Sequence, residues 1–402
     1  MRSIHFFFLA TITVGAVGGA GYIVKKQYDE EISARPVTPG PFFPDLKTRL
    51  NDITTLKITN AGKTVTLARL DDHSAEFPWT VIEKSGYYAD LDQVKQAAVG
   101  LSELIALEPR TNNPDLYVKI GVNDVDSPVS VATQIVAFDA AGKQLAGLLI
   151  GKNADVESLN RSGSFYARRL NHKQRGEPQS WLVEGRLPVE ANSIRWLYRP
   201  LPKIAYERLM AVSVRQPGGA IFTISRSDPK DHNFTLLAQP DDVKTKSSEI
   251  SDVSHGLDYL SFDEVSKENL IDFKGAVQAN YYSFDGLVVT ARSVQKDGKV
   301  WANFTSHFDT GQAAKAASQW PSLIPSPKTP DANSPSTPSA PERVESLNPL
   351  LPMTEVEKEA KRITQLYNGW AFQFSSHATT YLMRKIEDLI VLDVSEKKPE
   401  SK

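Results

Sequence analysis

Two stretches of the sequence decide the fold: "LKITNAGKTVTLARL" at Leu56–Leu70 and "VSVRQPGGAIFTISR" at Val212–Arg226. In each, apolar and polar residues alternate on both sides of a glycine-containing turn, and an arginine (Arg69 or Arg226) closes the second half. Alternation with a period of two is typical of a strand with one buried face, and the glycine favours a tight hairpin. Each stretch therefore predicts an antiparallel hairpin, and their likeness predicts two copies of one structural unit.

The likeness continues beyond the hairpins. The first copy is expected to add a strand at 78–84, a helix at 92–107 and a hairpin at 129–151, and the second a helix within 249–265 and a hairpin at 281–304. Three pairs of residues lie at nearly equal separations: Gly62 and Gly219, Leu101 and Leu257, Gly142 and Gly298. The predicted fold class is α+β, a tandem duplication of an antiparallel-sheet-plus-helix unit preceded by one N-terminal transmembrane helix.

One segment interrupts the repeat. Trp181 and Trp370 begin similar stretches but lie further apart than the other pairs, and a Pro/Ser-rich insertion at about 318–351 accounts for the excess. Its composition cannot bury enough apolar surface to order itself, so disorder is expected. Thr354–Glu357 then predicts a capping box that opens a helix through Tyr367. The expected domains are 47–203 and 204–391, followed by a charged tail at 392–402.

The N-terminus predicts a membrane anchor. Ile4–Val24 contains no fully charged residue, and as a helix it would reach about 30 Å, the thickness of a bilayer core. A cleavable signal peptide and a buried helix are the alternatives, but the apolar run continues past its small residues. We expect an anchor at 1–29, a Pro-rich spacer at 30–46, and the remainder of the chain outside the inner membrane, in the periplasm.

Composition and motifs exclude several functions. A net charge of −2 gives no basic field for nucleic acid, and the absence of cysteine excludes disulfides, thiolate catalysis and cysteine-based zinc sites. The seven histidines are scattered without metal-ligand spacing, and Asp71-Asp72-His73 is typical of a solvated turn. No nucleophile elbow or phosphate loop is present, so no catalytic residue, metal or cofactor is predicted.

One stretch suggests a binding surface. "FYARRL" at 165–170 combines Phe165 and Tyr166 with Arg168 and Arg169, a composition that can bind acidic sugars, lipid head groups or a partner's carboxylates. Alternation along a strand would place the two arginines on opposite faces. The simpler interpretation is an exposed cationic edge strand that discourages aggregation of the sheet.

A family resemblance rests on Ile150-Gly151, Tyr166-Ala167-Arg168, Trp181–Val183 and Leu187-Pro188, which match successive strands and a turn. These residues are similar to the pattern of the uncharacterised domain-of-unknown-function family 4340, which has no established catalytic residues. The resemblance implies a bacterial, membrane-anchored, periplasmic protein that accompanies ABC-type transport components of gliding-motility auxiliary systems. It argues by association and identifies no site.

Three functional hypotheses follow. The first is a non-enzymatic accessory protein that binds integral membrane transport components or another envelope partner through its edge strands and the Phe165–Arg169 strand. The second is a module that binds a glycan or lipid head group in a cleft between the two repeats, with Arg168 as a contact. The third is a hydrolase that uses two carboxylates distant in sequence.

Overall fold

The protein is described by a computed structural model that covers residues 38–72, 76–154, 163–238, 243–325 and 349–391. The predicted anchor, the first part of the spacer, most of the Pro/Ser-rich insertion and the charged tail lie outside these residues. Within them, no helix is long and apolar enough to cross a membrane. The chain divides into two compact units between Tyr198 and Arg199.

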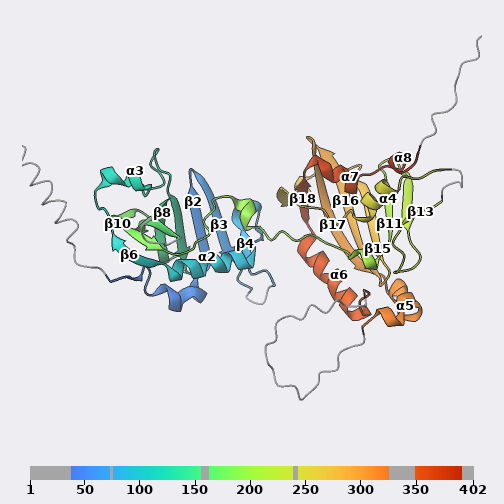
Figure 1. Ribbon diagram of the computed structural model, residues 1–402, viewed down its shortest axis with the longest axis horizontal. Helices are drawn as coiled ribbons and strands as arrows, with labels where there is room; N and C mark the ends of the chain where they lie inside the picture. The colour runs from blue at the N-terminus through green and yellow to red at the C-terminus, as the bar shows by residue number, and fades with distance from the viewer. Residues whose placement is uncertain (1–37, 73–75, 155–162, 239–242, 326–348, 392–402) are drawn as a thin grey trace, which may run out of the picture. The chain divides into compact units, whose positions relative to one another are not determined.

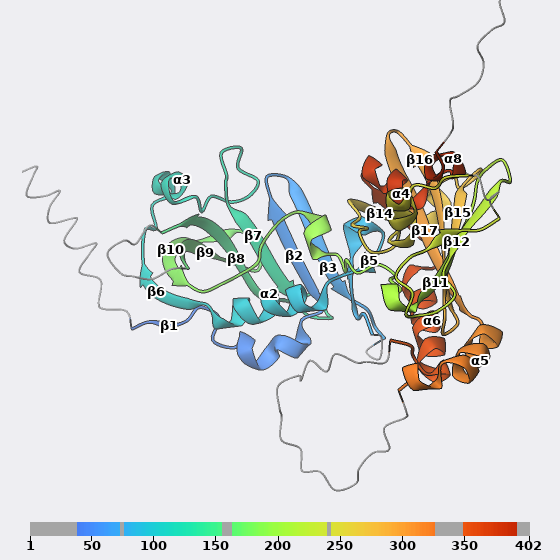
Figure 2. The ribbon, with the colours of Figure 1, turned by 45° about the vertical axis from the view of Figure 1, so that its right-hand side comes forward.

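The first unit is an antiparallel sheet of ten strands accompanied by short helices. Its strands are β1 (Gly40–Pro41), β2 (Thr55–Asn60), β3 (Lys63–Arg69), β4 (Trp79–Val81), β5 (Tyr87–Tyr88), β6 (Ile105–Pro109), β7 (Thr133–Phe138), β8 (Gln144–Asn153), β9 (Ser164–Leu170) and β10 (Gly176–Glu184). Its helices are η1 (Leu46–Asp52), η2 (Ile82–Lys84), α2 (Leu91–Glu103), η3 (Pro114–Leu116), α3 (Tyr117–Ile120) and η4 (Ser193–Trp196). Figure 2 shows β10, β9, β8, β7, β2 and β3 side by side, in that order.

The second unit is an antiparallel sheet of eight strands with more helical cover. Its strands are β11 (Leu209–Arg215), β12 (Ile221–Ser225), β13 (Thr235–Leu236), β14 (Glu264–Lys267), β15 (Val277–Ser283), β16 (Leu287–Lys296), β17 (Lys299–Phe308) and β18 (Trp370–Phe374). Its helices are η5 (Tyr206–Arg208), α4 (Ser247–Ser254), η6 (Glu268–Leu270), α5 (Thr310–Gln319), η7 (Pro321–Leu323), α6 (Met353–Tyr367), η8 (Ser376–Ala378), α7 (Thr379–Leu382) and α8 (Ile386–Leu389). Helix α6 packs against β16 and β17 (Figure 1).

Eight consecutive strands of the first sheet have the same order as the eight strands of the second, and only the outermost β1 and β5 have no counterpart. The first reads β1-β6-β10-β9-β8-β7-β2-β3-β4-β5, and the second, in reverse, reads β14-β18-β17-β16-β15-β11-β12-β13. Matching β2 with β11 and continuing along the chain therefore pairs β6 with β14 and β10 with β18, without a change of order. In both units a helix, α2 or α4, comes just before the matched strand β6 or β14. Each unit is accordingly a mixed α and β fold built on one antiparallel sheet.

The strand order corrects one of the expected equivalences. Gly142 lies in the β7–β8 turn, and the matching β15–β16 turn contains Gly286. Gly298 lies in the next turn, between β16 and β17. Gly142 and Gly298 are therefore separated by nearly the same distance along the chain as the other pairs, although their turns are not equivalent. Gly62 and Gly219, in contrast, both lie in the turn of the first hairpin of their unit. Connections of different length between matched strands produced the misleading spacing.

Two predicted helices differ in detail. The helix expected at 92–107 is α2, which ends at Glu103, because Leu104 is extended and Ile105–Pro109 forms β6 against β10. Asp90 begins the helix by accepting hydrogen bonds from two backbone amides of its first turn. The helix expected through Tyr367 is α6, but its capping box does not form, since Pro352 occupies the N-cap position.

Both faces of the first sheet are buried at the strands β7 and β8. One face carries a row of Ile58, Ile135 and Leu148, each fully buried. The opposite face carries Gln134 and Leu149, which are also buried. Here the chain between β6 and β7, residues 112–131, packs on β8 so closely that a Cβ at Gly151 would lie 2.3 Å from the carbonyl oxygen of Ile120. Residues 112–131 are called the covering segment below.

Two turn glycines give a matched test of the second sheet. Gly286 has a φ of +95°, and a Cβ there would lie 2.5 Å from the carbonyl oxygen of Asp309, whereas Gly298 has a φ of +72° with nothing within 4 Å. We expect Gly286→Ala to lower the free energy of unfolding by about 2–4 kcal/mol, and Gly298→Ala by about 1 kcal/mol, because only the first adds a clash to the backbone strain. Urea denaturation of both variants measures the difference. Equal losses would contradict the packing of this turn.

Candidate functional site

The strand predicted to bind a partner is β9, which lies inside the first sheet. It pairs with β8 on one side and β10 on the other, so the expectation of an exposed edge strand is wrong. Phe165 is buried and Tyr166 is half-buried. The alternation that the sequence predicted does place Arg168 and Arg169 on opposite faces. Each guanidinium group therefore has its own surroundings.

Arg168 is buried beneath the covering segment, with 5% of its surface exposed. Its Nε donates to the carbonyl oxygen of Glu177 at 2.7 Å, and its Nη1 donates to that of Val122 at 2.9 Å. The guanidinium group also lies 4.0 Å from the centre of the Tyr117 ring, while Asp124 is 3.4 Å away. Burial lowers the pKa of Arg168, and Tyr117 and Asp124 oppose that shift. These contacts fasten the covering segment to the sheet.

Arg169 performs a similar task on the other face. Its Nε and Nη2 both donate to the carbonyl oxygen of Phe42, at 3.0 and 2.9 Å. The guanidinium group lies 4.3 Å from the centre of the Phe42 ring and 5.3 Å from that of Trp181. Burial lowers the pKa of Arg169, with Glu177 acting in the opposite direction. The geometry of both arginines supports a structural role in preference to ligand contact.

The structural role of Arg168 can be tested against a neighbour. We expect Arg168→Met to lower the free energy of unfolding by about 2–4 kcal/mol, because two buried carbonyl groups lose their donors. Arg175→Met removes a side chain that is 56% exposed and pairs with Asp126, so it should cost less than about 1 kcal/mol. Thermal and urea denaturation measure both. If Arg168→Met is as stable as the wild type, Arg168 does not hold the covering segment.

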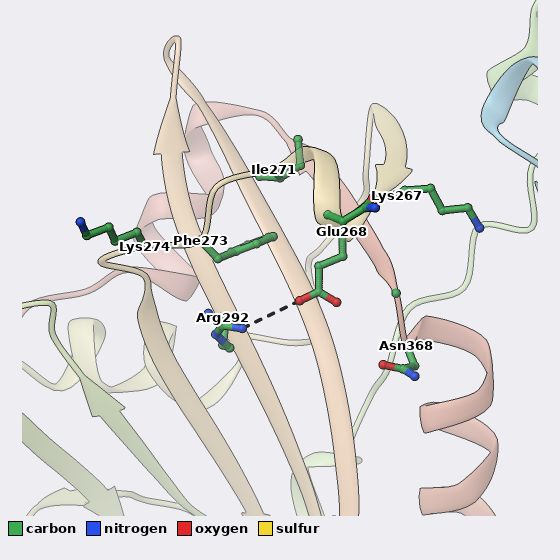
Figure 3. Close-up of a pocket in the computed structure, with 9 residues that line it drawn as sticks. Lys267, Glu268, Ile271, Phe273, Lys274, Arg292 and Asn368 are labelled. Atoms are coloured by element: carbon green, nitrogen blue, oxygen red, sulfur yellow. Dashed lines mark ion pairs between the residues drawn. The ribbon is translucent and has the colours of Figure 1, made fainter.

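The second unit contains a shallow pocket of about 800 Å³ at one end of its sheet (Figure 3). It is lined by η6 and the loop that follows, by Arg292 of β16, and by Asn368 and Gly369 before β18. Glu268 accepts a hydrogen bond from Nδ2 of the buried Asn303 at 2.5 Å, and its Oε1 lies 3.8 Å from Nη1 of Arg292. The pocket therefore combines one engaged carboxylate with a partly exposed guanidinium group.

The other cations of the pocket point in different directions. Figure 3 shows Lys267 extending away from the Glu268–Arg292 pair, and Lys274 lies on the opposite side of Phe273. The Nζ of Lys267 lies 3.4 Å from the centre of the Trp370 ring, and burial lowers the pKa of Lys267. Arg292 lies 5.5 Å from the centre of the Phe273 ring. This arrangement can hold an anion or a polar chain at the surface.

A second cluster of titratable groups surrounds the end of α4. His255 stacks on Tyr206, with ring centres 4.7 Å apart, and on the exposed Tyr259 at 5.8 Å. Tyr281 is buried beneath Gly256, and burial, together with Asp258, raises the pKa of its hydroxyl. Burial also raises the pKa of Asp258, with Glu207 adding to the shift and His255 and Lys203 opposing it. Because the aromatic rings stack on one another, we interpret this cluster as side-chain packing near the partly desolvated carboxyl group of Asp258.

The raised pKa of Asp258 predicts a pH dependence of stability. The folded state holds this proton more tightly than the unfolded chain, whose aspartate pKa is about 3.9, so stability falls as the pH rises from there through the raised pKa. We expect Asp258→Asn to abolish that fall and to raise the melting temperature at neutral pH. Thermal melts between pH 3.5 and 7 test this, with Asp263→Asn, an exposed aspartate, as control. A wild-type-like pH profile for Asp258→Asn would contradict it.

A buried ion-pair network holds the C-terminal end of the Pro/Ser-rich insertion. Arg208 donates to the fully buried Asp285 at 2.8 Å and to Glu359 of α6 at 2.8 Å, while the amide of Leu351 donates to Asp285 at 2.8 Å. Burial tends to lower the pKa of Arg208, but the two carboxylates raise it overall. This network fixes the start of α6 after the insertion. Within the described residues, no three histidine or acidic side chains gather in a way that would hold a metal ion.

The sequence did not predict the pocket or the row of polar side chains on the same side of the second sheet. The pattern that could have predicted this row is the alternation in "VQANYYS" of β15, where Val277, Ala279 and Tyr281 are buried and the residues between them are half-buried. That pattern predicts a sheet with one solvated face. The pattern does not indicate whether another segment packs over that face. In the first unit the segment that does so is the connection between β6 and β7, and the length of such a connection varies.

A family model described as "Domain of unknown function (DUF4340)" matches residues 79–278. This region of the chain therefore belongs to this family of uncharacterised domains. The match begins at β4 of the first unit and ends in β15 of the second, so it includes the covering segment, β9 and the loop that lines the pocket. Neither a curated protein nor a solved structure matches the chain.

Proposed function

We propose that the chain is a non-enzymatic, membrane-anchored accessory protein of the bacterial cell envelope that supports an ABC-type transport complex. The observation that carries this proposal is the order of segments in the sequence. An uncharged apolar stretch at Ile4–Val24 is followed by a Pro-rich spacer and then by two folded units. In this proposal Ile4–Val24 is a transmembrane helix in the inner membrane, and both units stand in the periplasm.

The charged groups of the two units are compatible with this role. Arg168, Arg169 and Arg208 are engaged by carbonyl groups, aromatic rings or carboxylates of the same unit. These three arginines hold loops and connections against the sheets. A protein that acts by binding a partner needs such a rigid scaffold and does not need a set of catalytic residues. The accessory role is therefore preferred to a hydrolase.

We further propose that the two units arose by tandem duplication. The order that eight strands of each sheet share supports this origin, as do the turn glycines Gly62 and Gly219 and the tryptophans Trp181 and Trp370 in the matched strands β10 and β18. After duplication the connections diverged. The β9–β10 connection is a short turn, while the matching connection holds α5, the Pro/Ser-rich insertion and α6.

The partner surface is proposed to be a sheet face in preference to a sheet edge. The outermost strands β1, β5 and β13 have two residues each, and β14 has four. Strands this short offer few unpaired backbone groups for an added strand. Strand addition at an edge, the contact expected from the sequence, is therefore not favoured for partner binding.

Cross-linking in intact cells tests the accessory role. We expect the affinity-tagged full-length protein, cross-linked and solubilised in detergent, to recover permease or ATPase subunits of an ABC-type transporter by mass spectrometry. The control replaces Ile4–Val24 with a cleavable export signal, which should weaken recovery because the body is no longer held at the membrane. Recovery of no transport component by the full-length protein, with expression and folding verified, contradicts the proposal.

A further inference from the structure

The two faces of the second sheet have different surroundings. The row of Val212, Tyr281, Val289 and Ser306 points to the helices. Tyr281 lies under Gly256 at the end of α4, and the hydroxyl of Ser306 donates to the carbonyl oxygen of Ala360 in α6 at 2.6 Å. This side of the sheet is the packed face. Because side chains alternate along a strand, the residues between these point to the other side.

The other side is a polar surface across five strands. Its central row is Thr223, Ser213, Asn280, Thr290 and Thr305, one residue from each of β12, β11, β15, β16 and β17. Four of these residues are half-buried and Thr305 is exposed. This side is called the open face. The contrast with the packed face is that of an antiparallel sheet with one solvated side.

Hydrogen bonds hold the polar groups of the open face in place. Thr290 Oγ1 donates to Oδ1 of Asn280 at 2.8 Å, and Gln278 Nε2 donates to the same oxygen at 3.1 Å. Thr223 Oγ1 donates to Oγ of Ser213 at 3.2 Å. The side chains are thus oriented before any ligand arrives, which reduces the entropy that binding must overcome.

The first unit shows that the open face is not an unavoidable result of the fold. There the matching side of the sheet is covered by the covering segment, and Leu149 is fully buried. In the second unit the matching connection, 268–276, is much shorter. Its Phe273 packs with Val294, Trp301 and Ala371 at one corner only. The central row keeps one exposed and four half-buried polar side chains.

The next row along the open face adds positive charge. It places Arg215 of β11 and Arg292 of β16 on either side of Gln278 of β15. The two arginines are two strand spacings apart, about 10 Å. Arg215 is exposed and the Arg292 side chain is 43% exposed, while the exposed Lys274 lies in the adjoining pocket. Glu268 pairs loosely with Arg292, at 3.8 Å, and its Oε1 also accepts the hydrogen bond from Asn303.

We propose that the open face of the second unit binds a linear acidic glycan, a chain rich in hydroxyl groups that carries carboxylates at intervals. Hydroxyl and amide side chains of the central row hydrogen-bond to the sugar hydroxyls, and Arg215 and Arg292 pair with carboxylates along the chain. The Lys274 side of the pocket extends the track past Arg292. This inference goes beyond the accessory role and does not depend on it.

The chemistry of the face favours a glycan over a membrane or a protein. A membrane surface is recognised by exposed apolar and aromatic side chains together with dense cations, and a protein interface by a desolvated apolar or aromatic centre. The central row contains hydroxyl and amide groups only, and the exposed apolar Ile221 lies at its margin. Positive charge on this face is complementary to carboxylates.

Binding of oligogalacturonate, a linear acidic glycan, to the full-length protein in detergent tests the proposal by titration calorimetry. We expect saturable binding that weakens as salt is added, and that weakens at least about tenfold for the methyl-esterified oligomer, which keeps its hydroxyls but loses its charges. Arg215→Gln with Arg292→Gln should weaken binding by at least about tenfold. Thermal melts verify that each variant folds.

The matched control is Lys358→Gln with Lys361→Gln, which removes two positive charges from exposed positions of α6, on the packed side of the sheet. This pair should leave binding unchanged. No binding of the wild type, or equal losses in the two double variants, overturns the proposal. Binding to vesicles of phosphatidylglycerol and phosphatidylcholine that requires Arg215 and Arg292, with none to the glycan, identifies a lipid surface instead and also overturns it.

Discussion

The structure depends on the burial of one apolar face of a broad antiparallel sheet, twice in one chain. In the second unit Tyr281 and Val289 lie beneath the helices, while Asn280 and Thr290 of the same two strands point the other way. Burial of the apolar rows supplies the main driving force, and alternation then decides where every polar side chain must go. The helices and the connections between strands are the variable parts laid on this frame.

Whether the second face is covered separates the two units. In the first, Arg168 binds two carbonyl groups and stacks on Tyr117, so the covering segment is held on the sheet by a buried charge. A buried guanidinium group is tolerated because acceptors and a ring replace its water. In the second, the short connection packs Phe273 at one corner, and the central row of the open face keeps polar side chains that are half-buried or exposed. The two units therefore share one strand order, although one has a covered sheet and the other has a sheet face available for binding.

Much of the fold could be predicted from the sequence, and the site could not. The hairpins at Leu56–Leu70 and Val212–Arg226 follow from local periodicity, which is a property of neighbouring residues. The helix ending at Tyr367 was also predicted, although the capping box on which that prediction rested does not form. Arg168 and Arg169 looked like a binding patch because periodicity does not report which strand is interior or what lies over it. Gly142 and Gly298 looked equivalent because spacing along the chain does not report strand order. Cover and order are set by contacts between residues distant in sequence.

The most direct test of this account is the accessibility of two positions, one on the covered face of the first sheet and one on the open face of the second, to a thiol reagent in the folded full-length protein, which has no cysteine of its own. Gln134 of the first sheet, 7% exposed, lies under the cover, and Thr290 lies in the central row of the open face. The account predicts that Thr290→Cys reacts with a maleimide far faster than Gln134→Cys, and that unfolding makes the two rates equal. A protected Thr290→Cys in the folded protein would mean that the second sheet is covered as well, and would contradict the account.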